Sequence, residues 1–251
     1  MLELSIGFFA LTAPAVLFAG ISKGGFGSGA AFASASILAL ILEPGQALAI
    51  MLPLLMLIDV TALKSYWKKW NWPDARLLIL GALPGVALGA LLYRSANADV
   101  LRFLIGAISI GFVAWQLARR NGLIRMSRRT ASTPLGLFAG VVTGFTSFVS
   151  HAGGPPAAVY LLSQNLAKNQ YQATTVLVFW VINITKFVPY AYLGMFTAET
   201  AFADMLLAPF AILGAWLGVR AHRIVSESVF FGITYVLLAM TGSKLIWDAL
   251  T

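Results

Sequence analysis

The stretch Lys23-Gly24-Gly25-Phe26-Gly27-Ser28-Gly29 interrupts an apolar run that extends from Leu4 to Leu42. As one continuous α-helix, that run would be about 58 Å long, which far exceeds the ~30 Å hydrocarbon layer of a bilayer. Four glycines in seven residues disfavour a regular helix. The sequence therefore predicts two apolar helical segments joined by a glycine-rich break.

A second break, His151-Ala152-Gly153-Gly154-Pro155-Pro156, divides the run from Pro134 to Leu166, which would be about 50 Å long as one helix. In each broken run the second segment is short, which is typical of a partial or slanted crossing. Six further apolar stretches have the length of a single span. They are Ala47 to Leu63, Leu77 to Tyr93, Val100 to Leu117, Tyr171 to Tyr192, Phe202 to Val219 and Val229 to Ala249.

The composition indicates lipid as the main solvent of the chain. Hydrophobic residues make up 59% of it and charged residues 10%, whereas soluble domains are about a quarter charged. We therefore predict an all-α integral membrane protein with eight to ten membrane-embedded helices. The N-terminus has no basic region and no small-residue cleavage site, so we expect a first span and not a removable signal peptide.

The basic residues predict an orientation in the membrane. The connection that holds Arg119, Arg120, Arg125, Arg128 and Arg129 is the most basic and is placed in the cytoplasm. With five crossings in each half, both termini lie outside. All but four of the 17 Lys and Arg then lie on the cytoplasmic side, and four crossings in the second half fit the charges less well. Because the net charge of +8 is scattered between apolar runs, topology explains it better than nucleic-acid binding.

Three short matches recur in the same order along the chain, at separations of 120, 124 and 125 residues. They pair Leu17-Phe18-Ala19-Gly20 with Leu137-Phe138-Ala139-Gly140, Ile58-Asp59-Val60-Thr61 with Ile182-Asn183-Ile184-Thr185, and Pro84 with its following Gly89-Ala90 with Pro209 and its following Gly214-Ala215. We predict a first membrane repeat at 1–118, a basic cytoplasmic linker at 119–133 and a second repeat at 134–251. An odd number of crossings per half makes this an inverted repeat, an architecture typical of secondary carriers.

The first break, from Gly20 to Gly27, resembles the opening of the TauE/SafE sulfite-exporter family, also called TSUP. The second break, the repeated Phe-Ala-Gly, the two-half organisation and the basic central loop resemble that family as well. The resemblance implies a secondary carrier of small, mostly sulfur-containing anions, such as sulfite or organosulfonates, in the bacterial inner membrane. It leaves the substrate and the direction open. Members are often drawn with eight spans, fewer than the ten segments counted above.

The substrate-binding site is predicted where the two breaks approach each other near the bilayer midplane. Lys23, flanked by Gly24, Gly25, Gly27 and Ser28, offers positive charge beside free backbone N–H groups, which suits an anion. The alternative is a lysine that reaches the cytoplasmic interface. We expect Lys23→Ala to weaken anion binding while leaving folding intact.

His151, next to Gly153 and Gly154, is the candidate of the second break. It could donate a hydrogen bond to an oxyanion or carry a proton, so protons are a further candidate partner. The alternative is an interfacial histidine that ends a helix. We expect His151→Ala, like Lys23→Ala, to impair anion flux.

Polar residues inside the apolar spans complete the candidate site. Asn183, Thr185 and Lys186 could donate to substrate oxygens, or could join helices. Asp59 would repel an anion, so its expected role is coupling or gating, in a pair with Lys23 or Lys64.

Other functions find little support in the sequence. An enzyme would have to rely on Asp59 and His151, and nothing identifies an electrophile for them. The segment around Lys23 lacks P-loop spacing, the chain has no cysteine, and its two histidines form no metal-binding motif, so no cofactor is expected. A channel remains open as an alternative, although it would call for a continuous polar pore.

Overall fold

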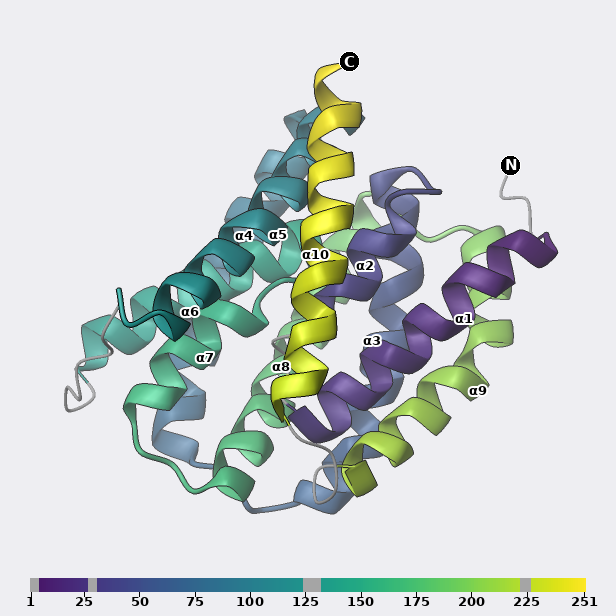
Figure 1. Cartoon of the computed structure of the whole chain (residues 1–251). Coiled ribbons are helices and arrows are strands. Elements are labelled where there is room, and N and C mark those ends of the chain that lie inside the picture. The colour runs from purple at the N-terminus through teal and green to yellow at the C-terminus, as the bar shows by residue number, and fades with distance from the viewer. Residues whose placement is uncertain (1–4, 27–30, 124–131, 222–226) are drawn as a thin grey trace.

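The computed structural model describes residues 5–26, 31–123, 132–221 and 227–251. In these ranges the chain forms α-helices and one π-helix and contains no β-strand, which confirms the all-α prediction (Figure 1). The elements are α1 (Ile6–Ile21), the π-helix η1 (Ser22–Phe26), α2 (Phe32–Leu38), α3 (Pro44–Tyr66), α4 (Trp72–Ser95), α5 (Ala98–Arg120), α6 (Thr133–Ser150), α7 (Gly154–Ser163), α8 (Lys168–Tyr192), α9 (Ala198–Ala221) and α10 (Glu227–Leu250).

Eight helices in the described part of the chain are long and apolar enough to cross a membrane, with α1 and η1 counted as one. Each predicted single span lies inside one of α3, α4, α5, α8, α9 and α10. The other two segments, α2 and α7, have 7 and 10 residues, which corresponds to about 10 to 15 Å of helix. They are too short to cross a bilayer alone, so the structure has eight long helices and two short partial ones, which agrees with the predicted eight to ten embedded helices and with the short second segment of each broken run.

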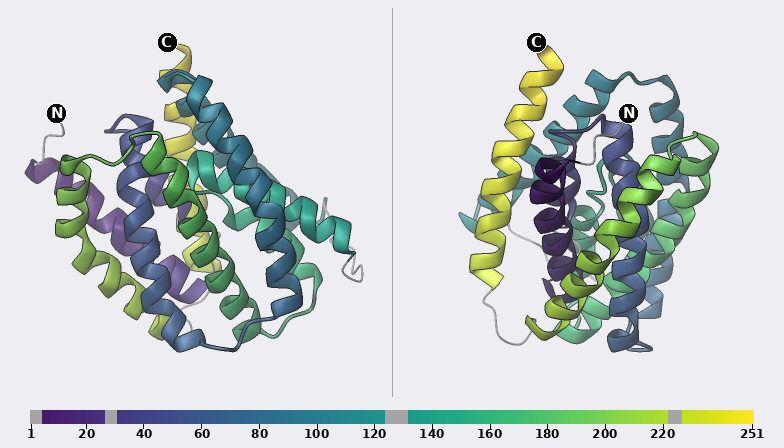
Figure 2. Two further views of the ribbon diagram at one scale, coloured as in Figure 1. Left: turned by 180° about the vertical axis from the view of Figure 1, so that it is seen from behind. Right: turned by 90° about the vertical axis from the view of Figure 1, so that its right-hand side faces the viewer.

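The two short helices reverse the direction of the chain. After the first break, α2 leads back towards the end of the molecule at which α1 begins, and α7 does the same for α6 (Figures 1 and 2). Three long helices follow in each half, so the two halves enter the bundle from different directions. This path is consistent with the predicted inverted repeat.

Several helix pairs join the halves, and two of them, α1 with α9 and α4 with α6, are equivalent glycine-lined crossings. Glycines allow the backbones to touch. A Cβ atom on Gly20 would lie 2.8 Å from the Cα of Gly214, and one on Gly140 would lie 2.8 Å from the Cα of Gly81. Gly20 and Gly140 are the two equivalent glycines of the first predicted match, so in both halves they take the same role.

The crossings correct the third predicted match. Gly140 meets Gly81, and Gly144 meets Ala82, whereas Gly20 meets Gly214 and Gly24 meets Ala215. By packing, Gly81-Ala82 in the first half is therefore equivalent to Gly214-Ala215 in the second half. The predicted equivalent, Gly89-Ala90, is wrong. In α4, Gly81, Gly85 and Gly89 recur every four residues on one face, so the sequence alone could not select the register.

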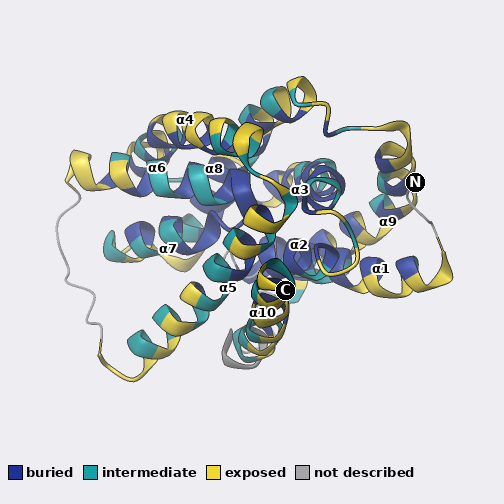
Figure 3. Cartoon of the chain, turned by 90° about the horizontal axis from the view of Figure 1, so that it is seen from above, coloured by how far each residue is buried: buried dark blue, intermediate teal, exposed yellow. Residues whose placement is uncertain are grey.

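The most buried spans, α3 and α8, stand at the centre, and the other helices surround them (Figure 3). The outer face carries exposed apolar side chains, such as Leu80, Leu88 and Leu91 of α4. An apolar exterior around a polar-containing centre is the arrangement expected in lipid. It supports a multi-pass membrane protein.

Charges separate towards the two ends of the molecule. The 67–71 and 164–167 connections lie at one end, and the termini lie with the 39–43 and 193–197 connections at the other (Figures 1 and 2). The first end carries Lys68, Lys69 and Lys168, whereas the second carries Glu43, Asp99 and Glu199 together with Arg102. This distribution agrees with the predicted orientation. Four of the arginines that were used to predict it, Arg125, Arg128, Arg129 and Arg223, lie outside the described residues.

Candidate functional site

Lys23 and Asp59 form an ion pair in the interior. The Lys23 Nζ lies 2.6 Å from Asp59 Oδ1, and the two side chains are 3% and 0% exposed. Asn183 Nδ2 donates to the other carboxylate oxygen of Asp59 at 2.7 Å. Asp59 and Asn183 are equivalent in the second predicted match, and a direct contact between them places the pair where the two halves meet.

His151 and Lys186 form a second buried pair. Lys186 Nζ lies 2.8 Å from His151 Nδ1 and donates to the carbonyl of Ser147 at 3.0 Å. His151 Nε2 lies 3.1 Å from the carbonyl of Leu48. Because a carbonyl only accepts, Nε2 must carry the proton, which leaves Nδ1 as the acceptor for the Lys186 ammonium. Beside a charged Lys186, this arrangement requires a neutral imidazole with its proton on Nε2.

The backbone of the second break aims the His151 side chain inwards. His151 follows the last residue of α6 with φ 54°, in the left-handed region. Its N–H donates to the carbonyl of Ser147, and the N–H of Ala152 donates to that of Thr146. A left-handed residue is a common way to end a helix, although glycine usually takes the position. Histidine is one of the few residues other than glycine that adopt this conformation readily.

Side chains from neighbouring helices satisfy carbonyl groups around the breaks. Gln172 Nε2 donates to the carbonyl of Lys23 at 2.6 Å, and the Tyr66 hydroxyl donates to that of Gly24 at 2.9 Å. In the second half, the Tyr190 hydroxyl donates to the carbonyl of Phe148 at 2.6 Å. Irregular backbone survives at membrane depth only when protein or water satisfies it in this way.

The sequence did not single out these capping residues, although it contains a signal for them. Gln172, Asn183, Lys186 and Tyr190 are separated by 11, 3 and 4 residues, which places them on one face of α8. All four are buried. A polar stripe on one face of an apolar span is the pattern that would have identified Gln172 and Tyr190.

The buried cluster has more positive than negative groups. Lys23, Lys186 and Asp59 are its charged members among the described residues, since His151 is neutral. The Lys23 ammonium has a carboxylate partner, whereas Lys186 is held by an imidazole and a carbonyl. A bound anion with one negative charge would bring the net charge of the cluster to zero.

The two breaks come together, as predicted. Ala152 of the second break packs in one apolar cluster with Phe32 and Ala33, which open α2 after the first break. Phe179 of α8 lies between them as well. The Lys23 ammonium stands 5.7 Å from its ring centroid, and a Cβ atom on Gly153 would lie 2.9 Å from its edge.

The glycines of the candidate site also have packing roles. A Cβ atom on Gly24 would lie 2.5 Å from the carbonyl oxygen of Ala215, and one on Gly25 would lie 2.2 Å from that of Gly218. Gly154 begins α7. Close approach to α9 therefore explains Gly24 and Gly25 without a ligand, and Gly27 and Ser28 lie outside the described residues.

Thr185 is the predicted site residue that the structure does not bring into the cluster. Its hydroxyl donates to the carbonyl of Val181, one turn earlier in the same helix. Asn183, two residues before, has its amide directed at Asp59. Spacing alone predicted both residues as donors to a substrate. It could not show that the Asn183 amide already binds Asp59 or that the Thr185 hydroxyl binds its own helix.

The site thus consists of two broken helices with buried cations at their junction, in a bundle of eight spans. The family description "Sulfite exporter TauE/SafE" matches residues 12–245, nearly the whole chain. The chain belongs to the TauE/SafE family. This confirms the resemblance found in the motifs, and the family is one of membrane transporters. No curated protein and no solved structure matched the chain.

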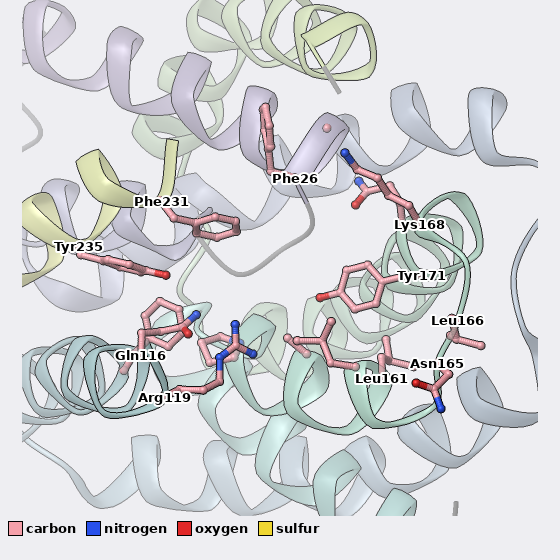
Figure 4. A pocket seen from close by; sticks show the side chains of 16 residues that line it. Phe26, Gln116, Arg119, Leu161, Asn165, Leu166, Lys168, Tyr171, Phe231 and Tyr235 are labelled. Atoms are coloured by element: carbon pink, nitrogen blue, oxygen red, sulfur yellow. The ribbon is translucent and has the colours of Figure 1, made fainter. Parts of the chain in front are cut away.

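The TauE/SafE chain also contains a cavity of about 560 Å³ between η1, α5, α7, α8 and α10 (Figure 4). Gly25 and Phe26 of η1 line it, and so does Gln172, which binds the carbonyl of Lys23. The cavity lies at the end of the molecule that carries the 164–167 connection. It therefore reaches from that end to the first break.

Proposed function

We propose that this protein is a secondary carrier that moves a small, sulfur-containing anion, such as sulfite or an organosulfonate, across the bacterial cytoplasmic membrane. The membership of the chain in a transporter family supports the general class. The family suggests the sulfur-containing anion and the bacterial membrane, and the buried ammonium groups support an anion as the substrate.

The buried Lys186 carries this proposal. Its side chain is 0% exposed, and its partners in the described structure are an imidazole nitrogen and a carbonyl oxygen. An ammonium group without a carboxylate is expensive at membrane depth, and such groups usually have a function. An ammonium group has three donors, and these two partners use two of them. An oxyanion would take the third and neutralise the charge.

The arrangement favours alternating access over an open channel. Lys23, Asp59 and Lys186 are buried, so the cluster is closed, while a cavity approaches the first break from one end. The second break comes from the half that enters the bundle from the other direction. Movement of one half against the other would open the cluster to each end in turn.

Asp59 is proposed as the coupling residue. The groups that face its carboxylate are Lys23 from η1 and Asn183 from α8, and Lys186 acts on it electrostatically. While Asp59 is ionised, it competes with a substrate anion for Lys23. A proton on Asp59 would release the Lys23 ammonium to the anion, so proton and anion would cross together. Asp59→Asn should then remove the pH dependence of flux.

The purified protein in proteoliposomes tests the proposal directly. Efflux of sulfite, thiosulfate, sulfoacetate and simple carboxylates would be compared with that from empty liposomes. We expect saturable flux of at least one sulfur oxyanion or sulfonate, at a rate that carboxylates do not reach. Equal leakage of all anions from protein-containing and empty liposomes would exclude the carrier.

A further inference from the structure

The cavity at the 164–167 end carries positive charge. Arg119 of α5 and Lys168 of α8 both line it, and none of its described lining residues is acidic. Neutral hydrogen-bonding groups complete the wall, among them Gln116, Tyr171 and Tyr235. The Arg119 guanidinium and the Tyr171 hydroxyl point towards one another across the space (Figure 4).

The other end of the molecule has the opposite balance. A cavity of about 830 Å³ there is lined by Glu43 and Asp248 together with Arg102. Two carboxylates and one guanidinium face that opening, against two cations and no carboxylate among the described residues at the first. Clefts lined by one sign of charge raise the local concentration of opposite ions about 10-fold or more. The first cavity therefore attracts anions, and the second does not.

The first cavity also leads to the buried cluster. Gln172 is 1% exposed, lines the cavity and donates to the carbonyl of Lys23. Gly25, two residues after Lys23, lies in the same wall. An anion in the cavity is thus separated from the Lys23 ammonium by the backbone of η1 and by one side chain that holds it.

We infer that this cavity is an anion-binding vestibule, in which Arg119 and Lys168 bind a small oxyanion or organosulfonate before it enters the buried cluster. Its volume lies in the range of ligand pockets, about 300 to 1,000 Å³. A hydrated oxyanion fits with room to spare, and so does a sulfonate with a short carbon chain. The vestibule makes loading asymmetric, with a lower KM from this end than from the other.

Only the expected effect of the vestibule on transport rests on the proposed carrier function. The charge of the vestibule can be measured without transport. The chain has no cysteine, so Ala158→Cys places a single thiol in the cavity wall. Rates of modification by an anionic and a cationic thiosulfonate reagent of similar size would be compared. Arg119→Gln with Lys168→Gln is the test, and Arg76→Gln, an exposed arginine outside the lining, is the control.

We expect the anionic reagent to be favoured at the introduced thiol, and the ratio of the two rates to fall about 10-fold in the double variant. In flux assays the double variant should raise KM by a similar factor and leave kcat unchanged, while Arg76→Gln changes neither. An unchanged reagent ratio and KM in the double variant would overturn the vestibule and leave the carrier intact. Absence of flux in the unaltered protein, with the reagent ratio as expected, would instead overturn the carrier.

Discussion

The Lys23 ammonium and the Asp59 carboxylate stabilise each other's charge, because both side chains are buried. The ion pair changes the sequence-based expectation that Lys23→Ala leaves folding intact, since the substitution would strand a carboxylate with Asn183 as its hydrogen-bond partner. Breaking a buried pair by removing one partner costs about 3 to 5 kcal/mol, whereas replacing both can be neutral. Single substitutions of Lys23 or Asp59 therefore need a folding check or the paired variant beside them.

We expect Lys23→Met to lower the unfolding free energy of the protein by about 3 to 5 kcal/mol. Adding Asp59→Asn should restore most of the loss, because no unpaired charge then remains in the pair. Thermal unfolding in detergent measures both variants. Lys244→Met is the control, since Lys244 pairs with Asp248 at the exposed end of α10, and such pairs contribute about 0 to 1 kcal/mol. Additive losses in the double variant would contradict the pairing.

The sequence predicted which residues form the buried cluster, but it did not predict all of the contacts between them. Lys23, Asp59, Asn183 and Lys186 stood out because polar residues are rare in such spans. Their partners depend on how α3, α8 and η1 pack, which spacing along one chain cannot give. Gln172 was missed because polar side chains near the end of a span resemble ordinary interfacial residues.

At the scale of elements, the glycine crossings hold the halves together. A methyl group at Gly140 would lie 2.6 Å from the carbonyl oxygen of Leu78, and one at Gly20 would lie 2.7 Å from the nitrogen of Ala215. Backbone atoms cannot move aside as a flexible side chain can. The two helices of each crossing would have to separate.

We expect Gly140→Ala and Gly20→Ala each to destabilise the protein by about 1 to 3 kcal/mol. Gly111→Ala in α5 is the matched control, because a Cβ atom there meets nothing within 4 Å, and alanine favours a helix by about 0.5 to 1 kcal/mol. Unfolding temperatures in one detergent compare the three variants. Similar temperatures for Gly140→Ala and Gly111→Ala would show that α4 and α6 do not pack so closely.

The elements themselves were largely predictable. Apolar length gave the single spans, and glycine and proline gave the two breaks. The sequence predicted a short segment after each break, but it could not give the end of α2, because Ala39-Leu40-Ile41-Leu42 after that helix are equally apolar. The register of the third repeat match failed for a related reason, because Gly81, Gly85 and Gly89 are equally suited to a close crossing.

At the scale of the whole molecule, the separation of charge predicts sidedness. The end with Lys68, Lys69 and Lys168 should face the cytoplasm, and the end with both termini should face outwards. Single-cysteine variants test this cleanly in a chain without native cysteine. We expect the thiol of Thr251→Cys to react with an impermeant reagent from outside, and that of Lys69→Cys only after the cytoplasmic face is exposed. The reverse pattern would invert the topology.

The buried Lys186 ammonium is proposed to bind the transported anion, and flux through a Lys186→Met variant tests this proposal. Methionine replaces the apolar stem of lysine and removes a charge that has no carboxylate partner among the described contacts, so the protein should remain folded. Losing a buried charge-assisted contact costs about 2 kcal/mol or more, which lowers anion affinity on the order of 30-fold.

The measurement is sulfite uptake into proteoliposomes, with Lys244→Met as the matched control and unfolding temperature as the check on folding. We predict that Lys186→Met folds normally but loses most of its uptake, while Lys244→Met stays within about twofold of the unaltered protein, because an exposed pair contributes little. Normal uptake by a folded Lys186→Met protein would show that the anion binds elsewhere.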